Sequence, residues 1–483
     1  MQHFIVLFSV LIILTGCKEE PIPVPPPPPP LDVVGSVAVW RTNATGTLAM
    51  VKELDSLPFQ APMASADVTF HVDQAQSYQS MDGFGAAMTG SSAYVLMEHM
   101  SAQNRKTLLE EMFSIENGIG ISYLRLTMGA SDFSQNSFTY NDLPSGQEDL
   151  AMRNFSLEKE QAYLIPVLKE ILAISPDLSI MATPWTAPAW MKDNRSLING
   201  GKLNPAYYDA YAQYFVKYLE EMGSVGIEIK AITIQNEPLH KAGYPTMSMT
   251  SQEQKIFIKN HLGPAFSDAN LSTQIIIYDH NWDEVQYPLD ILSDPEAKRM
   301  VHGSAFHCYA GEVSAMSQVH AAHPDRGIYF TECSGGDWSP DFGANLAWNM
   351  ENIMVGATRN WAETVLFWNL ALDENNGPQN GGCKDCRGVV TVNSSSGRVT
   401  KNVEYYLLGH MAKLVRPGAL RIATPLTRGE GISQVAFKNT DGSLVLVAFN
   451  HKDSLQTIQV RQEDNTFVYI IAPGMLASFS WMP

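Results

Sequence analysis

The sequence predicts an α/β protein: a (β/α)8 TIM barrel with an appended β-sandwich. Three observations predict this fold. Short β-rich runs alternate with helix-like stretches in the middle of the chain, only short strands follow them, and a β-like segment precedes them. Eight strands with crossover helices fit a closed barrel better than an open sheet. The eight runs are Gly83–Met88, Tyr123–Leu126, Ser179–Pro184, Ala231–Gln235, Gln274–Tyr278, Ser304–Cys308, Ile328–Thr331 and Thr364–Trp368.

The elements between and after these runs complete the fold. Segments such as Leu157–Ile174 and Pro205–Met222 have a helical pattern. After about Tyr405 the strands become short and closely spaced, as in a small β-sandwich. The β-like segment Ser36–Val72 could add strands to that sandwich. The predicted domains are therefore sandwich strands at 36–75, the barrel at 76–404 and the C-terminal sandwich at 405–483.

The first 35 residues are predicted to lie outside the fold. Phe4–Leu14 is too short an apolar run to span a bilayer and is typical of a signal-peptide core. Leu14-Thr15-Gly16-Cys17 resembles a bacterial lipobox, which predicts a signal peptide at 1–17 and lipidation of Cys17. Met1–His3 lacks the usual Lys or Arg, and an ordinary secretory signal with a chance cysteine is the alternative.

A Pro-rich linker at 18–35 follows. Eight prolines between Pro21 and Pro30 favour extended polyproline II, a semi-rigid spacer. Lys18-Glu19-Glu20 also resembles a surface-export signal of Bacteroidetes-type lipoproteins. We therefore expect an extracytoplasmic protein, lipid-anchored to the bacterial outer membrane and facing either the periplasm or the cell surface.

Composition excludes two classes of protein. With 45% hydrophobic and 17% charged residues, the chain is not disordered. Its net charge of −18 repels phosphate backbones, so no nucleic-acid partner is expected. The nine Trp residues are compatible with sugar-stacking surfaces and equally with a large apolar core.

Four cysteines follow Cys17. Cys383 and Cys386 form one C-x-x-C, and without a second pair nearby a zinc site is not expected. Outside the cytoplasm these two could form a local disulfide. Cys308 and Cys333 are expected to be buried thiols.

Polar and aromatic residues follow nearly every predicted barrel strand. Functional side chains of TIM barrels gather at the C-terminal ends of the strands. Seven such sets predict a site rather than a series of turns. They are Arg125 with Asp132, Trp185, Asn236-Glu237, Asp279-His280-Asn281, His307 with Tyr309, Glu332, and Trp368-Asn369.

Two glutamates stand out in this group. Glu237 and Glu332 each follow an apolar run, and they end the fourth and seventh predicted strands. Paired carboxylates at a barrel mouth are what glycosidic cleavage needs. Charge on Glu332 is expected to raise the pKa of Glu237, so that Glu237 can act as an acid near neutrality. A structural salt bridge is the alternative for either residue alone.

The chain resembles family 30 of the glycoside hydrolases, which contains the glucosylceramidases. The resemblance extends over nearly the whole chain after the linker. It rests on Gln79–Ala86, Leu124–Ser134, Ala182–Lys192, Gln235–Pro238, Asp279–Trp282, Thr331-Glu332 and Trp368–Leu370.

The resemblance implies a retaining mechanism. No cofactor is expected, because carboxylate chemistry alone suffices, and no metal is expected, because the His residues do not cluster with ligand spacing. Glu237 would be the general acid/base and Glu332 the nucleophile, with carboxyl groups about 5–5.5 Å apart. Asn236 would bind the sugar 2-OH, and Trp368 would stack on the sugar. The other implied contacts are Asp132 and Trp185 to hydroxyls of the non-reducing sugar and Tyr309 to the nucleophile.

Four residues keep two interpretations. Arg125 would hold a carboxylate in its charged form through a bidentate fork, or form a structural ion pair. His307 either supports the site or is a satisfied barrel-end histidine. Asp279 and His280 match a family motif, and structural support is favoured over substrate contact.

Two departures from the glucosylceramidases favour another substrate. The loop Gly381–Gly388 carries cysteines and lacks the substrate-contacting Asn, which resembles the β-1,6-glucanase branch. Met88-Thr-Gly-Ser91 lacks the acid that many members carry after Thr. We therefore expect a retaining β-glycosidase for β-glucosidic bonds, with β-1,6-glucan first, glucosylceramide second and β-xylan third. A non-catalytic glycan-binding surface lipoprotein and a metal-dependent hydrolase are the alternatives from other classes.

Overall fold

The computed structural model describes residues 36–425 and 431–483. The predicted signal peptide, the lipidation site Cys17 and the linker lie outside these residues. Within them, no helix is both long enough and apolar enough to cross a membrane.

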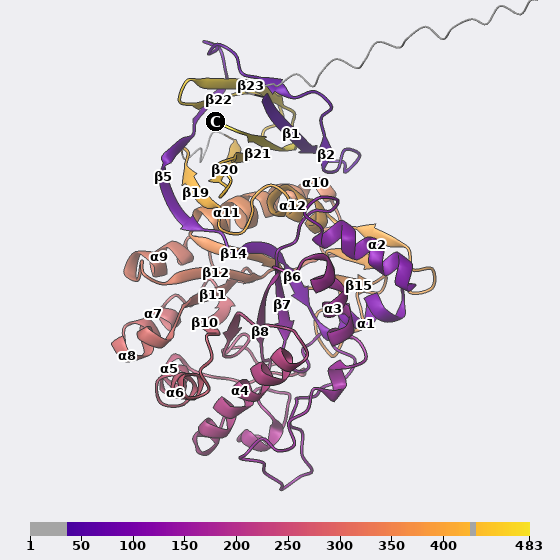
Figure 1. Cartoon of the computed structure of the whole chain (residues 1–483), viewed down its shortest axis with the longest axis vertical. Helices are drawn as coiled ribbons and strands as arrows, with labels where there is room; N and C mark the ends of the chain where they lie inside the picture. The colour runs from indigo at the N-terminus through magenta and orange to yellow at the C-terminus, as the bar shows by residue number, and fades with distance from the viewer. Residues whose placement is uncertain (1–35, 426–430) are drawn as a thin grey trace, which may run out of the picture. The chain divides into compact units, whose positions relative to one another are not determined.

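Eight parallel strands close into a barrel, as predicted (Figure 1). A cluster of fully or almost fully buried side chains, one from each of seven strands, fills it. Tyr123, Ile276 and Leu366 are among them. In order around the barrel, the strands are β6 (Gly83–Met88), β7 (Tyr123–Thr127), β8 (Ser179–Thr183), β9 (Ala231–Thr233), β10 (Gln274–Asn281), β11 (Gly303–His307), β12 (Gly327–Glu332) and β14 (Ala362–Phe367).

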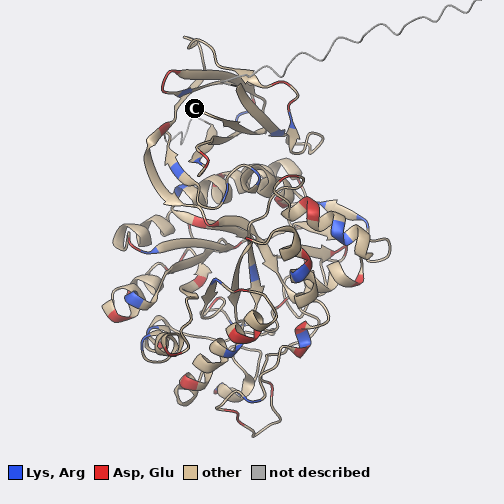
Figure 2. Cartoon of the chain, in the orientation of Figure 1, with Lys and Arg blue, Asp and Glu red and all other residues tan. Residues whose placement is uncertain are grey.

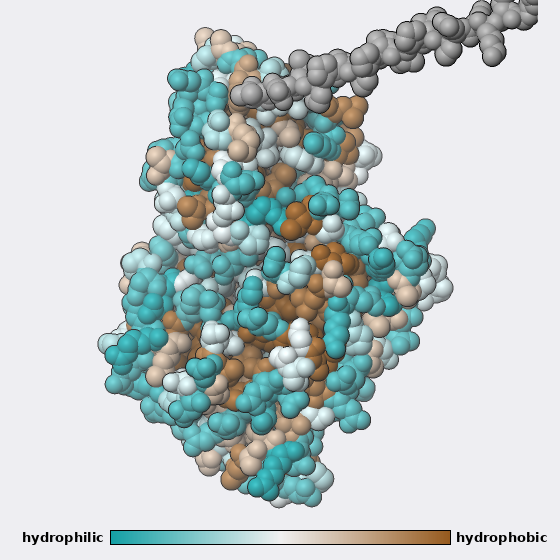
Figure 3. All heavy atoms as spheres, in the orientation of Figure 1, coloured by the Kyte–Doolittle hydropathy of each residue, from teal (hydrophilic) through white to brown (hydrophobic). Residues whose placement is uncertain are grey.

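Helices follow and cover the barrel strands. The longest, α4, buries Tyr211, Tyr214, Tyr218 and Phe215, while its polar residues face outward. On the face shown in Figure 3, hydrophilic residues cover most of the outer helices, and apolar residues show in the recesses between them. The helices are α1 (Gly90–Glu98), α2 (Ala102–Phe113), α3 (Leu164–Ile174), α4 (Tyr208–Ser224), α5 (Ser251–Phe257), α6 (Gly263–Asp268), α7 (Gln286–Leu292), α8 (Pro295–Met300), α9 (Ala315–Ala322), α10 (Phe342–Asn349), α11 (Val355–Arg359) and α12 (Val403–Ala412).

The two ends of the described chain build the β-sandwich together. The predicted contribution of the N-terminal segment is confirmed, because β1 pairs with β24, β4 with β22 and β5 with β19. Val39, Phe70, Leu446 and Phe479 belong to its apolar core. The strands are β1 (Ser36–Thr42), β2 (Val51–Lys52), β3 (Leu57–Pro58), β4 (Val68–His71), β5 (Asp73–Ser80), β19 (Leu420–Ala423), β20 (Ile432–Lys438), β21 (Leu444–Asn450), β22 (Gln456–Gln462), β23 (Asn465–Ile471) and β24 (Leu476–Trp481).

The change to β-structure comes later than the predicted boundary at residue 405. Helix α12 crosses that position and packs against β6 of the barrel. Nearly all of its residues are buried, so it has no amphipathic pattern by which the sequence could reveal a surface helix. The C-terminal sandwich strands begin only at Leu420.

Three short pairings lie in the loops after the last barrel strands. β13 (Gly335–Gly336) pairs with β16 (Cys386–Arg387), and β17 (Val390–Val392) pairs with β15 (Ala371–Asp373) and β18 (Val399–Lys401).

Charged residues of both signs are interspersed over the helices in Figure 2.

Candidate active site

Most of the predicted strand-end residues line one pocket of about 390 Å³. Arg125 and His307 lie below its lining and are fully buried. The lining residues are Asp132, Trp185, Asn236, Glu237, His240, Tyr244, His280, Asn281, Tyr309, Glu332, Trp338, Trp368, Cys383 and Cys386.

Arg125 lies at the centre of the charge network. Its Nη1 donates to Glu332 Oε2 at 2.5 Å, and its Nη2 donates to Asp279 Oδ2 at 2.9 Å and to Asn236 Oδ1 at 2.8 Å. The guanidinium therefore bridges two carboxylates, and the predicted bidentate fork on one carboxylate is wrong. The reason is that the strand ends present acceptors from three directions. Each acceptor is oriented by the same buried cation.

Asp279 is fully buried, does not line the pocket and accepts hydrogen bonds from several side chains. It accepts hydrogen bonds from Arg125, from Thr233 Oγ1 and Thr331 Oγ1 at 2.7 Å each, and from His307 Nε2 at 3.0 Å. Burial alone would raise its pKa, but the charge of Arg125 and the contact with His307 hold the pKa far below its usual range. Structural support, the favoured interpretation for Asp279, agrees with this position.

The backbone is strained where these residues leave their strands. Tyr278, Asp279, Glu237 and Asn369 have positive φ angles of 73°, 60°, 43° and 60°. Residues other than glycine rarely adopt positive φ angles, and such backbone strain is common at functional sites. In β10 it accompanies a register shift between Tyr278 and His280, which sequence alternation does not reveal.

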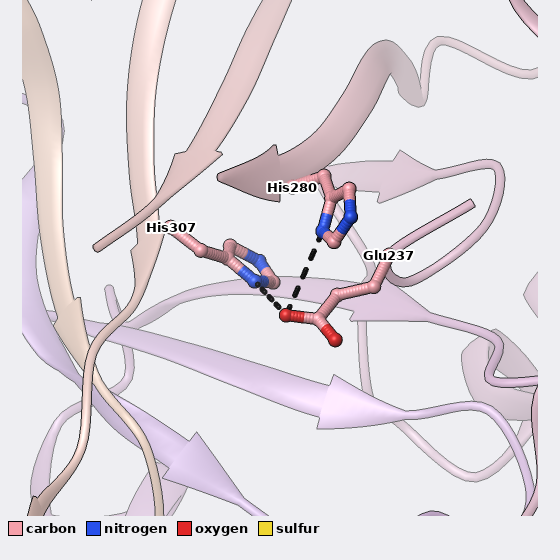
Figure 4. Close-up of side chains that lie close together, drawn as sticks. All are labelled: Glu237, His280 and His307. Atoms are coloured by element: carbon pink, nitrogen blue, oxygen red, sulfur yellow. Dashed lines mark hydrogen bonds and ion pairs between the residues drawn. The ribbon is translucent and has the colours of Figure 1, made fainter. Parts of the chain in front are cut away.

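Two histidines, His280 and His307, lie next to one carboxylate oxygen of Glu237 (Figure 4). Its Oε1 lies 3.1 Å from His307 Nδ1 and 3.7 Å from His280 Nδ1. Burial raises the pKa of Glu237, but its contacts with His280 and His307 outweigh burial and hold the pKa below its usual range. The expectation that Glu332 raises this pKa is therefore wrong for the free site, because the side chains in contact with Glu237 are histidines, and these lower its pKa.

The two glutamates both lie close to one ring nitrogen of His307. His307 Nδ1 lies 3.1 Å from Glu237 Oε1 and 3.8 Å from Glu332 Oε1, so these oxygens are no further apart than the two distances together. That limit fits the ~5–5.5 Å of retaining glycosidases and excludes nearly all of the ~6.5–9.5 Å range of inverting ones. Tyr309 Oη donates to Glu332 Oε1 at 3.0 Å, as the resemblance implied.

The inner wall of the pocket is aromatic. Trp185 and Trp368 stack with ring centroids 5.1 Å apart, and both lie over the Arg125 guanidinium. Asp132 lies beside them, where burial and the charges of Glu332 and Glu237 raise its pKa well above the usual value. A raised pKa favours the neutral carboxyl, the form that can donate as well as accept a hydrogen bond to a sugar hydroxyl.

A three-residue group resembles a metal site. Potential ligand atoms of Glu237, His280 and His307 all lie within 4.8 Å of one another. The histidines lack metal-ligand spacing in the sequence, but folding brings the three residues together from the ends of β9, β10 and β11. Both ring nitrogens of His307 already contact carboxylates, at 3.1 and 3.0 Å. The expectation that no metal takes part stays a prediction.

The raised pKa of His307 should make the free energy of unfolding depend on pH. Burial would lower its pKa, but Glu332, Asp279 and Glu237 raise it to about 9. Because the folded protein binds the His307 proton more tightly than the unfolded chain does, protonation of His307 adds to the free energy of unfolding. This contribution, on the order of 3 kcal/mol, is complete below about pH 6.5 and is lost as the pH rises through 9. The difference in unfolding free energy between the wild type and His307→Gln, measured from pH 6 to 9.5, should follow this loss. A pH-independent difference would contradict it.

The cysteines form two disulfides. Cys383 pairs with Cys386 in the rim loop. Cys308 and Cys333 are also paired, so the expectation of buried thiols is wrong. They follow the adjacent strands β11 and β12, an adjacency that their 25-residue separation in sequence conceals. Each is next to a site residue, since Cys308 lies between His307 and Tyr309 and Cys333 follows Glu332.

Removing the Cys308–Cys333 disulfide should destabilise the protein. The double variant Cys308→Ala/Cys333→Ala is expected to lose about 3 kcal/mol of unfolding free energy, because the closed loop restricts the unfolded chain. Cys383→Ala/Cys386→Ala is the matched control, and its much shorter loop predicts a smaller loss. Denaturant unfolding of both variants measures the difference. Equal losses would contradict the argument.

Strand-end reasoning missed part of the rim. Trp338, Tyr244 and His240 line the pocket from loops rather than from strand ends. His240 Nε2 lies 2.9 Å from the Tyr244 hydroxyl. The signal available for Trp338 was a tryptophan within the loop-forming segment Ser334–Asp341.

A closed (β/α)8 barrel with two neighbouring glutamates at one end places the protein in the class of the barrel glycoside hydrolases. Residues 81–415 match the glycosyl hydrolase family 30 TIM-barrel domain, and residues 418–475 match the family 30 β-sandwich domain. The chain therefore belongs to glycoside hydrolase family 30.

Relatives and solved structures refine this comparison. An endo-1,6-β-D-glucanase of Neurospora crassa is 37% identical, covering 77% of this chain and 79% of the relative. The lysosomal acid glucosylceramidase of Mus musculus is 29% identical, covering 87% and 85%. The solved structure of an endo-β1,6-glucanase is 37% identical with a TM-score of 0.86, covering 93% of this chain and all of that one.

Proposed function

We propose that the chain is a retaining β-glucanase that cleaves β-1,6-glucan by double displacement. The observation that carries the mechanism is that Glu237 and Glu332 lie 3.1 and 3.8 Å from the same atom, His307 Nδ1, which limits the distance between their carboxyl groups. The substrate is supported by relatives named endo-1,6-β-D-glucanase and by the Cys383–Cys386 loop at the rim.

In the first step, a Glu332 oxygen attacks the anomeric carbon while Glu237 gives a proton to the leaving oxygen. We infer that the free site holds that proton on His307, because contacts with three carboxylates raise the pKa of this residue and its Nδ1 lies 3.1 Å from Glu237 Oε1. Transfer along this hydrogen bond makes Glu237 the acid. In the second step, Glu237 takes a proton from water, the water oxygen attacks the anomeric carbon, and Glu332 leaves as a carboxylate.

The other side chains hold these groups and the sugar. Arg125 donates to one oxygen of Glu332, and Tyr309 donates to the other. Asn236, oriented by Arg125, would bind the sugar 2-OH. Asp132, Trp185 and Trp368 would bind the rest of the reacting sugar.

Product analysis tests the substrate. Purified protein is incubated with β-1,6-glucan, glucosylceramide and β-xylan, and the anomeric configuration of the first products is followed by NMR. We expect β-configured products from β-1,6-glucan and slower or no release from the other two. Faster cleavage of glucosylceramide would overturn the substrate and would favour the candidate named by the mouse relative. Tight glycan binding without hydrolysis over days would favour the non-catalytic alternative.

We also propose a lipid anchor at Cys17 in the bacterial outer membrane, supported by the lipobox-like sequence alone. Cys17→Ala should abolish incorporation of labelled fatty acid in cells and move the protein from the membrane to the soluble fraction. Unchanged labelling and fractionation would contradict the anchor. Protease treatment of intact cells would distinguish a surface-facing protein from a periplasmic one.

A further inference from the structure

An exposed tryptophan stands at the mouth of the pocket. Trp338 lines it and is 55% exposed. The two other indoles of the pocket, Trp185 and Trp368, are buried and stack on each other. No aromatic ring in residues 36–425 and 431–483 pairs with Trp338, so its ring is free to stack on a ligand. A large exposed aromatic surface at the rim of a binding site is typical of a ligand contact.

We propose that Trp338 is the binding platform for the departing glucosyl unit of a β-glucan, a site that rests on the function proposed above. Glu332 and Asp132 are 5% and 9% exposed, so the sugar under attack must lie in the buried part of the pocket. Its leaving oxygen must face Glu237, and the rest of the chain must leave through the mouth. Trp338 and Tyr309, the exposed aromatic side chains there, are positioned to contact it.

The loop holds this indole in a fixed place. Asp337 N donates to Asp385 O at 2.8 Å, and Asn376 Nδ2 donates to Asp337 Oδ2 at 2.7 Å. Arg387 donates to Gly336 O and pairs with Glu404 of α12 at 2.8 Å. The Trp338 loop is thus connected through the Arg387–Glu404 ion pair to a helix that packs on the barrel. Preorganisation of this kind reduces the entropy that binding would otherwise cost.

Gly336 makes room for the platform. A Cβ atom there would overlap ring carbons of Trp338 and the carbonyl oxygen of Asp385. An alanine at 336 must therefore displace the indole or break the β13–β16 pairing. This offers a way to move the platform without altering Trp338 itself.

One loop connects the two sugar-binding regions. In β16, Cys386 pairs with Gly336, next to the platform loop. The same loop reaches Asp132 of the inner wall, because Asn380 N donates to Asp132 O at 2.7 Å and Gly382 packs against the Asp132 side chain. The Cys383–Cys386 disulfide lies between these contacts and restrains the spacing between the reacting sugar and the platform.

The test isolates the departing sugar. For wild type and Trp338→Ala, kcat/KM is measured with β-1,6-linked gluco-oligosaccharides and with β-glucosyl fluoride, whose leaving group is too small to reach the platform. We expect a loss of about tenfold or more with the oligosaccharides and little change with the fluoride. Trp338→Tyr should recover most of the loss. Trp348→Ala, which removes an exposed tryptophan of α10 outside the pocket, should change neither value.

A second measurement tests the platform in the second step of the reaction, in which the glucosyl unit is transferred from the enzyme to an acceptor. Enzyme trapped as a 2-fluoroglucosyl intermediate is reactivated by water or, faster, by a sugar acceptor that occupies the place of the departing unit. Trp338→Ala and Gly336→Ala should lose the acceleration by gentiobiose and keep the rate with water. Equal losses with oligosaccharide and fluoride, or unchanged acceleration by gentiobiose, would overturn the inference. A wild type that turns over the fluoride but not β-1,6-glucan would instead refute the proposed substrate.

Discussion

Replacing Glu332 with alanine is expected to lower kcat for an activated β-glucoside by at least about four orders of magnitude. Without this carboxylate no covalent glycosyl-enzyme can form, and a good leaving group does not compensate for a missing nucleophile. Initial rates with a dinitrophenyl β-glucoside measure the loss. Turnover within tenfold of wild type would contradict the nucleophile assignment.

Added azide gives this variant a distinctive product. A small anion in the space of the removed carboxylate attacks the anomeric carbon directly, so the product should be the α-glucosyl azide. Arg125 keeps Asp279 as a partner in the variant, which favours an intact fold. Glu363→Gln is the matched control, because Glu363 is a barrel-strand glutamate outside this pocket and its loss should leave kcat unchanged.

The barrel and the strand-end residues are predictable because they depend on local patterns. The strands at Gly83–Met88 and Ile328–Thr331 appear as short apolar runs, and a closed barrel places the residues that follow them at one end. The sequence alone therefore predicts that Glu237 and Glu332 lie at the same end of the barrel. The start of the C-terminal sandwich was less accessible, because the uniformly buried helix α12 has no distinctive period.

The failed expectations depend on how neighbouring strands align. The pairing of Cys308 with Cys333 requires the register of β11 against β12. The low pKa of Glu237 requires His280 and His307 to project from the next two strands toward one carboxylate. No pattern within a single segment contains these relations. Trp338 depends further on a loop pairing between β13 and β16.

Replacing Glu237 with alanine should separate substrates by their leaving groups. A sugar alkoxide needs a proton as it departs, so kcat/KM for gluco-oligosaccharides should fall by about two to four orders of magnitude. Dinitrophenolate leaves without protonation, so formation of the glycosyl-enzyme should remain nearly as fast as in wild type. The covalent intermediate should then accumulate, because Glu237 no longer activates water, and a burst followed by slow turnover should appear. Equal losses for both substrates would contradict the acid/base role.

The same variant tests the part played by His307. Its raised pKa depends in part on the hydrogen bond to Glu237, so removal of that carboxylate should lower the pKa of His307 from about 9, which NMR of the imidazole can follow. Azide should restore turnover with the dinitrophenyl substrate and give the β-glucosyl azide, since Glu332 still forms the first bond and azide replaces the activated water. The opposite anomers from the Glu237 and Glu332 variants would assign each carboxylate to its face of the sugar. Identical anomers from both variants would rule out double displacement with these two residues in these roles.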